Sequence, residues 1–428
     1  MKQDVQARSP GGTMAASAGR TLGMVPHINL QAFCETDAVV SAITAATQDR
    51  RLSKVQAKVH MGGAPAAIEA YRDAATPNVV VIEVHGDRDT ILAQLDEFAE
   101  FCDASSKVVV VGRVNDIVLY RELISRGVSQ YLVAPFDALY FVEAVAELYS
   151  APGASPVGRI ISVYGTKGGV GASTIAHNLA WTIARAIDAA TVVADLDLAF
   201  GTVGLDFNHD PPQSIAEAVF SSTRFDTNML DRLMTRCSDR LSLLTAPATL
   251  ERTYDFTDAG FEPLIDAMRA TVPFNVLDVP HVWTAWSREA LVTADEILLV
   301  ATPDLASLRN TKSLVDTLRA ARPHDAAPKV VMNMVGVPKR PEIALDEFAK
   351  ALEVTPCAVL PFEPKVFGTA ANNGQMIGEI ESAGKIAETF AELARVTTGR
   401  TESRPVKRKL FEPLLEPLMG KIARRKAS

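Results

Sequence analysis

The stretch Gly165-Thr166-Lys167-Gly168-Gly169-Val170-Gly171-Ala172-Ser173-Thr174 decides how this chain folds. The apolar run Ile160–Val163 precedes it, and the helically spaced run IAHNLAWTIARAI follows it. Backbone N–H groups in such a glycine loop can surround a phosphate, and the N-terminus of the following helix adds partial positive charge. Strand, glycine loop and helix in this order predict a phosphate-binding loop. A glycine-rich turn without a ligand is the alternative interpretation.

Aspartates follow two further apolar runs of the chain. Asp195-Leu196-Asp197 comes after Val192–Ala194, and Asp278 comes after Phe274–Leu277. A single Asp at the end of a strand often only caps the next loop. Three aspartates at strand ends that face one phosphate-binding loop fit a metal site better, because Mg²⁺ prefers oxygen ligands.

Taken in order, these motifs resemble the MinD/ParA family, the SIMIBI P-loop ATPases with a deviant Walker A loop. Lys167–Gly171 is similar to that loop, whose signature lysine is the first residue of KGGxGK[ST]. Asp195 and Asp197 match the family's second acidic motif, and Asp278 matches its Walker B position. The resemblance covers about residues 160–398.

The resemblance implies ATP and Mg²⁺ as ligands. Ser173, Asp195 and Asp278 would hold Mg²⁺, partly through water, and Asp195 and Asp197 would orient the metal or the attacking water if hydrolysis occurs. Asn333 and Pro361-Phe362 match places that contact adenine in the family, although a lone Asn is also a common turn residue. The nucleotide-binding residues implied in this way are Lys167, Gly168, Gly169, Val170, Gly171, Ala172, Ser173, Thr174, Asn333, Pro361 and Phe362.

The loop departs from the family at one position. Family members carry a second lysine directly before the Ser/Thr, whereas this chain has Ala172. That lysine normally reaches the β- and γ-phosphates. Binding can persist through backbone N–H groups, Mg²⁺ and Lys167, so we expect at most a slow ATPase. In the family the signature lysine reaches the nucleotide of a facing subunit, and this implies a nucleotide-sandwich homodimer.

Residues 26–150 predict a smaller α/β domain. Its end, Tyr131–Phe136, resembles the fifth strand of a response-regulator receiver, a flavodoxin-like fold. Receivers need an aspartate, a hydroxyl and a lysine at three positions, and this chain has Glu83, Gly112 and Ala134 there. We therefore expect a degenerate receiver-like domain that is not phosphorylated and serves docking or dimerisation. The short apolar runs that predict its parallel strands are Ile28–Cys34, Lys54–His60, Val79–Val84, Val108–Arg113 and Gln130–Val133.

Composition indicates the other boundaries. A chain of 428 residues that is 48% hydrophobic can bury more than one core. We expect a disordered leader at 1–25 and a small-residue linker at 151–158. A nucleotide-binding domain with a mostly parallel sheet and helices on both faces is expected at 159–400, and a basic, partly apolar tail at 401–428. The four scattered cysteines favour a reducing cytoplasm.

The tail contains VKRKLFEPLLEPLMGKIARRK, which mixes basic with apolar residues. Such a segment can lie on an anionic membrane surface. We therefore expect a cytoplasmic protein with peripheral contact at the inner membrane or the cell pole. Pro413 and Pro417 interrupt any single helix here, so a solvated tail is the alternative.

Further features resemble the Flp/Tad pilus-assembly branch of the family, called TadZ or CpaE. They are the GGVGAST loop with alanine for lysine, the added receiver-like domain, Asp295 in its sequence context, and Ala371–Gly374. This resemblance implies a positioning protein that acts with pilus machinery related to type IV pili and type II secretion.

Two other classes share the fold. A ParA-like DNA-partitioning ATPase is the alternative, but a net charge of −8 disfavours nucleic acid as a partner. Bacterial tyrosine kinases end in a tyrosine cluster, and no tyrosine follows Tyr254.

Overall fold

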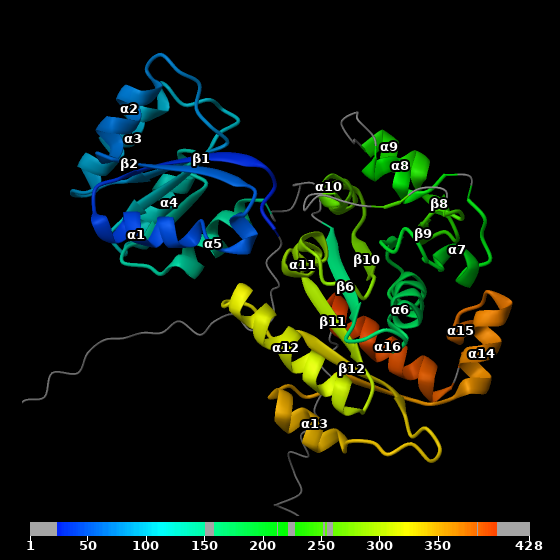
Figure 1. The fold of residues 1–428 in the computed structure, drawn as a ribbon. Coiled ribbons are helices and arrows are strands. Elements are labelled where there is room, and N and C mark those ends of the chain that lie inside the picture. The colour runs from blue at the N-terminus through cyan, green and yellow to red at the C-terminus, as the bar shows by residue number, and fades with distance from the viewer. Residues whose placement is uncertain are drawn as a thin grey trace, which may run out of the picture.

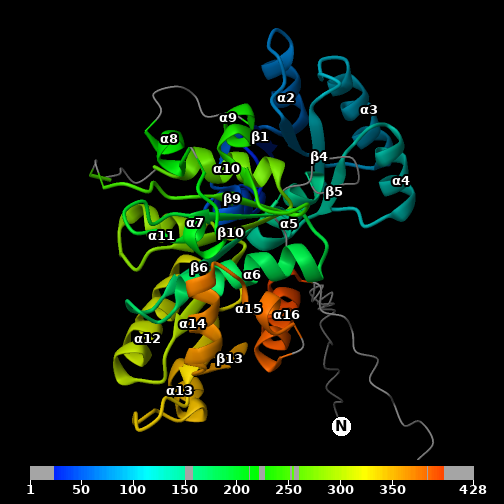
Figure 2. The ribbon, with the colours of Figure 1, turned by 90° about the vertical axis from the view of Figure 1, so that its right-hand side faces the viewer.

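A computed structural model describes residues 24–149, 158–211, 213–220, 227–250, 253–254, 260–382 and 384–399. The predicted tail, residues 1–23 of the predicted leader and nearly all of the predicted linker lie outside these residues. Met24 and Val25, the last two residues of the predicted leader, are described and are buried. Figures 1 and 2 show two α/β units, one N-terminal and one larger, each built around its own sheet.

The N-terminal unit has a parallel five-stranded sheet in the order β2-β1-β3-β4-β5, a flavodoxin-like arrangement. The central strand β3 is buried along its whole length because helices cover both faces. Val39 of α1 and Phe141 of α5 pack on one face, and Ile91 of α3 and Leu119 of α4 on the other. Its elements are β1 (Ile28–Cys34), α1 (Asp37–Ala46), the 3₁₀ helix η1 (Arg50–Leu52), β2 (Val55–Met61), α2 (Gly63–Tyr71), β3 (Val79–Glu83), α3 (Arg88–Ala99), β4 (Lys107–Gly112), α4 (Ile117–Ser125), β5 (Gln130–Val133) and α5 (Ala138–Leu148).

Aspartates set the start of three helices in this unit. Asp87, Asp116 and Asp137 each accept a hydrogen bond from a backbone N–H in the first turn of α3, α4 and α5. A carboxylate at this position satisfies an otherwise unpaired N–H group and favours the helix over a continued loop. The helices therefore begin where the sequence places these residues after each strand.

The larger unit has an eight-stranded sheet among the described residues, in the order β13-β12-β11-β6-β10-β7-β9-β8. All its pairs are parallel except that of β8 with β9. Its elements are β6 (Arg159–Gly165), α6 (Ala172–Ala186), β7 (Thr191–Asp195), α7 (Val203–Asp206), α8 (Ile215–Val219), α9 (Thr227–Leu233), β8 (Thr235–Arg236), β9 (Leu241–Leu244), α10 (Glu262–Thr271), β10 (Phe274–Val279), α11 (Ala285–Val292), β11 (Glu296–Ala301), α12 (Leu305–Ala321), β12 (Lys329–Val335), α13 (Leu345–Leu352), β13 (Ala358–Pro361), α14 (Pro364–Asn373), α15 (Ile377–Ile380) and α16 (Lys385–Thr398).

Helices cover both faces of the larger sheet, as expected. Leu179 of α6 and Phe390 of α16 belong to one buried cluster, and Met268 of α10, Leu291 of α11 and Val315 of α12 belong to another. The first strand, β6, lies between β10 and β11, so the chain leaves it towards one side of the sheet and later returns to the other. The carboxyl end of such a central strand is where open α/β sheets bind ligands.

Two details differ from the sequence predictions. The apolar run Val330–Met332 predicts a strand that Asn333 ends. The strand β12 instead continues to Val335, across an irregular register opposite β13, so Asn333 lies inside it. The two-residue strand β8 was not predicted, since a segment that short carries no detectable period.

Candidate nucleotide-binding site

The glycine loop connects β6 to α6 at the carboxyl edge of the larger sheet. Gly169 and Gly171 have φ angles of 76° and 83°, a region that side chains disfavour. A Cβ atom on Gly168 or Gly169 would meet nothing within 4 Å, whereas Val170 is buried and anchors the loop. The loop therefore leaves an open concave backbone in front of the helix N-terminus, the geometry that receives a phosphate.

Three side chains, from β12, from α12 and from the loop after β10, hold this loop in place. The Asn333 amide donates to the Val170 carbonyl over 2.8 Å, and the Asn310 amide donates to the Thr166 carbonyl over 2.9 Å. A ring nitrogen of His281 lies 2.7 Å from the Gly165 carbonyl. Asn333, predicted to contact adenine, is thus a loop support in this structure, with its amide donor already engaged.

Lys167 pairs with Asp304, the residue that caps the N-terminus of α12. Lys167 Nζ donates to Asp304 Oδ2 over 2.8 Å, and the two side chains are 35% and 27% exposed. The same carboxylate accepts from Thr302 Oγ1 and from the Ser307 backbone N–H. Partial burial acts to raise the pKa of Asp304, but these hydrogen bonds, that of Lys167 foremost, lower it to about 2. The signature lysine, Lys167, is therefore held by a partner near the surface, and breaking this ion pair costs little free energy.

The predicted acidic residues meet beside the loop. Asp195 ends β7 and lies opposite Asp278 in the neighbouring strand β10. Both side chains are buried, and Asp195 accepts hydrogen bonds from the backbone N–H groups of Asp197 and Val203. Burial, followed by the charge of Asp278, raises the pKa of Asp195. Two oxygen-rich side chains on adjacent strand ends form a donor set that suits Mg²⁺.

A fully buried histidine joins this acidic group. His177 of α6 places Nδ1 at 2.7 Å from Asp206 and Nε2 at 3.2 Å from Asp278, the latter an ion-pair distance without hydrogen-bond alignment. Burial acts to lower the pKa of His177, but its bonds and charge interactions with these two carboxylates outweigh burial and raise it. Part of the negative charge beside the loop is thus balanced from within the protein.

The remaining predicted residues lie along the same edge. Ser173 and Thr174 are half-buried in the first turn of α6. The Asp197 carboxylate accepts from the Phe200 backbone N–H and shapes the loop after β7. Pro361 ends β13, the outermost strand on that side of the sheet, and Phe362 directly follows it.

Sequence reasoning missed three residues of this site. His177 had no signal beyond its place in the helix after the loop. The sequence predicts His281 to be a loop histidine rather than a ligand; it does lie in the loop after β10, and its contact with Gly165 bridges 116 positions of the chain. Asp304 offered one usable signal, since an Asp that starts a helix after a strand is a predictable cap.

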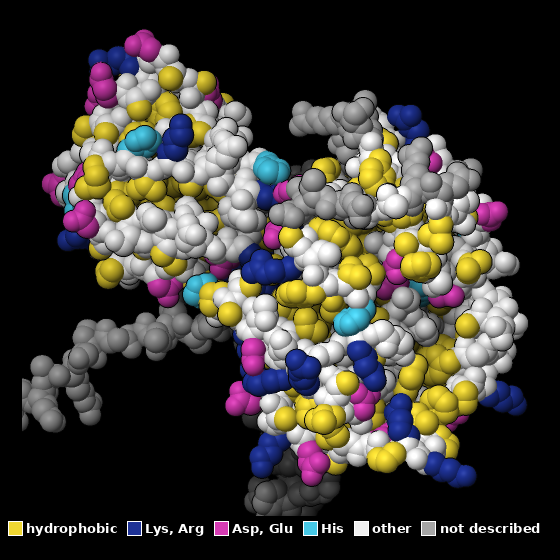
Figure 3. Space-filling model, viewed as in Figure 1, with side chains coloured by type: hydrophobic (Ala, Val, Ile, Leu, Met, Phe, Trp, Pro, Cys, Tyr) yellow, Lys and Arg dark blue, Asp and Glu magenta, His cyan; other side chains and the backbone are white. Residues whose placement is uncertain are grey.

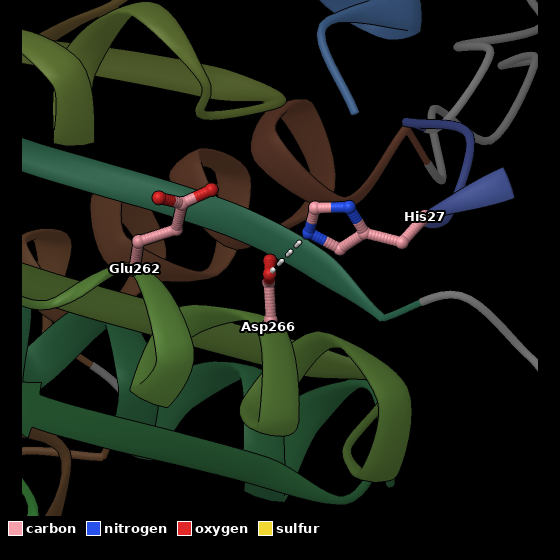
Figure 4. A group of neighbouring side chains, drawn as sticks. All are labelled: His27, Glu262 and Asp266. Carbon is pink, nitrogen blue, oxygen red and sulfur yellow. Dashed lines mark ion pairs between the residues drawn. The ribbon is translucent and has the colours of Figure 1, made fainter. Parts of the chain in front are cut away.

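A second group of ligand-type side chains lies between the two units and carries no metal assignment. His27, Glu262 and Asp266 approach one another (Figure 4), but the Lys54 ammonium already contacts Asp266 and lies 3.7 Å from Glu262. We interpret this group as an ion-pair contact between the units.

Comparisons with known proteins identify relatives of this chain. Residues 158–328 match a family model described as an AAA domain. The chain is 25% identical over 250 residues to the septum site-determining protein MinD of Synechocystis sp., covering 56% of this chain and 90% of that protein. It is 42% identical to a crystal structure of the pilus assembly protein CpaE from Caulobacter crescentus, covering 30% of this chain and 97% of that one, with a TM-score of 0.29.

The chain belongs to the MinD/ParA family of P-loop ATPases, with similarity to CpaE. A ParA family ATPase from Chlorobium tepidum shares the fold at 23% identity, covering 55% of this chain and 98% of that one, with a TM-score of 0.50. Within this MinD/ParA chain, no helix of the described residues is long and apolar enough to cross a membrane.

Proposed function

We propose that this chain is an ATP-binding positioning protein for Flp/Tad pilus assembly whose nucleotide state controls self-association across the P-loop edge. One observation carries the proposal. The loop is open for a phosphate, yet the side chain that should serve its own subunit is Ala172, and the remaining lysine, Lys167, rests on a partly exposed partner, Asp304. A lysine held in this way is available to the nucleotide of a facing copy.

Exposed apolar side chains at the same edge support self-association. They follow the carboxyl ends of β7, β10 and β11, on the loops there and on the helices α7 and α12. The large exposed residues among them are Phe200, Leu205, Val282, Trp283 and Leu305. Leu305 directly follows the Lys167 partner Asp304, and Trp283 contacts the ring of Tyr164. Apolar residues that gather around a charged site are typical of a surface that becomes buried.

Mg²⁺ and the triphosphate would be held by different parts of the edge. The backbone of residues 167–171 and the start of α6 face the phosphates, and Ser173, Asp195 and Asp278 supply oxygen ligands, partly through water. Asp195 and Asp197 would orient water in any hydrolysis. Without a lysine at position 172, little side-chain charge from the same subunit offsets the transition state, so turnover is weak or absent.

The partners follow from the CpaE similarity. The N-terminal receiver-like domain docks on pilus machinery proteins, and the basic tail brings the protein to an anionic membrane or a cell pole from the cytoplasm. A DNA-partitioning role is disfavoured because the net charge of the chain is −8. On the face in Figure 3, Lys and Arg side chains alternate with acidic and hydrophobic ones.

Equilibrium ATP binding and steady-state turnover of the purified chain with Mg²⁺ test this proposal. We expect binding with little turnover, and we expect Ala172→Lys to raise turnover by at least about ten-fold because it restores charge at the phosphates. Ala172→Gln, of similar length but uncharged, is the matched control and should stay at the wild-type rate. Failure of the wild type to bind ATP, or rapid wild-type hydrolysis, would contradict the proposal.

A further inference from the structure

An ion cluster joins the two units at Asp325, in the connection between α12 and β12. The guanidinium groups of Arg50 and Arg51, from η1 of the N-terminal unit, both contact its carboxylate. Arg322 adds a bond of 2.8 Å from its own unit. Only 11% of the Asp325 side chain is exposed. Three cations on one largely buried carboxylate form a specific contact, because loss of any partner leaves charge without solvent.

A second contact lies close to the first in sequence. Lys54, just before β2, reaches Asp266 and Glu262 of α10. The N-terminal unit therefore docks through the short segment 50–54, which carries cations towards acidic side chains of the larger unit. We call the Asp325 cluster with its arginines the joint.

The helix α12 connects the joint to the nucleotide loop. It has 17 residues and thus spans about 25 Å. Its first residue follows Asp304, the partner of Lys167, and Arg322 of the joint directly follows its last residue. Figure 1 shows the helix running along the larger unit with one end directed towards the N-terminal unit.

Further contacts make α12 a stiff connection. Its N-terminal half is tied to the loop a second time, through the Asn310 amide and the Thr166 carbonyl. Leu318, in its last turn, is fully buried against the sheet, and Arg322 donates to the Leu291 carbonyl at the end of α11. A displacement at one end of such a helix cannot be absorbed locally, since packed elements move as units.

We infer that α12 couples docking of the N-terminal unit to the state of Lys167, so that the joint restrains nucleotide-dependent self-association. This rests on the function proposed above. With the joint intact, α12 keeps Asp304 in position to retain Lys167. When Lys167 leaves for a facing nucleotide, Asp304 loses its cation. The contacts at the start of α12 that the joint stabilises through this helix are then weakened. The coupling is reciprocal, as any linkage between two binding equilibria must be.

Breaking the joint in the full-length chain tests the inference. We expect Asp325→Asn and Arg50→Gln each to lower the protein concentration needed for half-maximal self-association in Mg²⁺ and ATP by about five-fold or more, the lower range of allosteric couplings. Arg126→Gln is the matched control, because Arg126 pairs with Asp96 and Glu122 within the N-terminal unit. It should stay within about two-fold of the wild type. Circular dichroism checks that each variant is folded. If one of the two joint variants misfolds, the other still tests the inference.

A double variant shows whether the effect passes through Lys167. Asp304→Asn keeps a good helix cap but removes the charge that retains the lysine. In this background Asp325→Asn should add nothing, because the restraint is already released. Unchanged self-association in the joint variants, or a full additional effect in the Asp304→Asn background, would overturn the coupling while leaving the proposed function in place. A wild type that does not associate with ATP would instead refute both.

Discussion

The carboxyl edges of the two sheets use the same architecture in opposite ways. In the N-terminal unit, the positions at which receivers carry the aspartate and the hydroxyl make contacts within the unit. Glu83 is buried at the end of β3, and its carboxylate accepts from the backbone N–H groups of Glu35 and Thr36 and from the Thr36 hydroxyl. A Cβ on Gly112 would lie 2.4 Å from the Tyr131 hydroxyl, which donates to the Val114 carbonyl. At Glu83 and Gly112 this edge is therefore filled by contacts within the N-terminal unit.

The edge of the larger unit is open by contrast. Gly168 and Gly169 face free space, Lys167 is partly exposed, and apolar side chains stand exposed around the loop. The comparison teaches that strand order alone does not indicate activity. A ligand-binding site is recognised by polar groups whose partners within the protein are weak or replaceable. An edge without such a site is recognised by polar groups whose partners are buried.

The largest expected effect is on stability, and it should differ between the two edges. Glu83→Ala leaves two partly buried N–H groups and a hydroxyl without an acceptor, which should cost about 3 kcal/mol in the free energy of unfolding. Lys167→Ala removes a partly exposed ion pair and should cost less than about 1 kcal/mol. Urea unfolding of both variants measures the two values. Equal losses in the free energy of unfolding for the two variants would contradict the difference between the two edges.

The next effect concerns the exposed apolar side chains. Trp283→Ala should weaken ATP-dependent self-association about ten-fold, because an aromatic residue buried in an interface commonly contributes more than 1 kcal/mol. Ile117→Ala on α4 is the matched control, since Ile117 is 66% exposed and Trp283 is 50% exposed. Sedimentation with ATP compares them. A larger loss for Ile117→Ala would place the self-association surface on the N-terminal unit.

The smallest expected effect is a pH dependence at His177. The carboxylates of Asp206 and Asp278 outweigh burial and raise its pKa from 6.5 to about 10. A raised pKa in the folded state stabilises the protein fully below pH 6.5, and this contribution is lost as the pH rises through about 10. Thermal unfolding without metal should therefore show a difference in midpoint temperature between wild type and His177→Asn that narrows from pH 6.5 to 10. A difference in midpoint temperature that stays constant or widens over this pH range would contradict this prediction.

The local features of the fold could be predicted from the sequence. The strand predicted at Ile28–Cys34 has those bounds in the structure, and the strand containing Asp278 lies beside the one that ends at Asp195. Both follow from apolar runs and from the rule that parallel strands share a carboxyl edge. The glycine loop was predicted for the same reason, since its signal is contiguous.

The contacts that determine how the site works could not be predicted. The pair of Lys167 with Asp304 joins residues 137 positions apart, and the contact of Arg50 with Asp325 joins residues 275 positions apart. No periodicity or local propensity encodes such a meeting, which depends on the packing of whole helices. Asn333 shows the same limit, because its amide could serve a base or a loop carbonyl until the fold placed Val170 beside it.

Sedimentation equilibrium with Mg²⁺ and ATP, ADP or no nucleotide tests the central claim most directly. We expect the wild type to be dimeric with ATP and monomeric with ADP or without nucleotide, and Lys167→Ala to stay monomeric in all three because no lysine reaches the facing nucleotide. Equal masses for wild type and Lys167→Ala in all three conditions would contradict the claim that an open P-loop edge switches self-association.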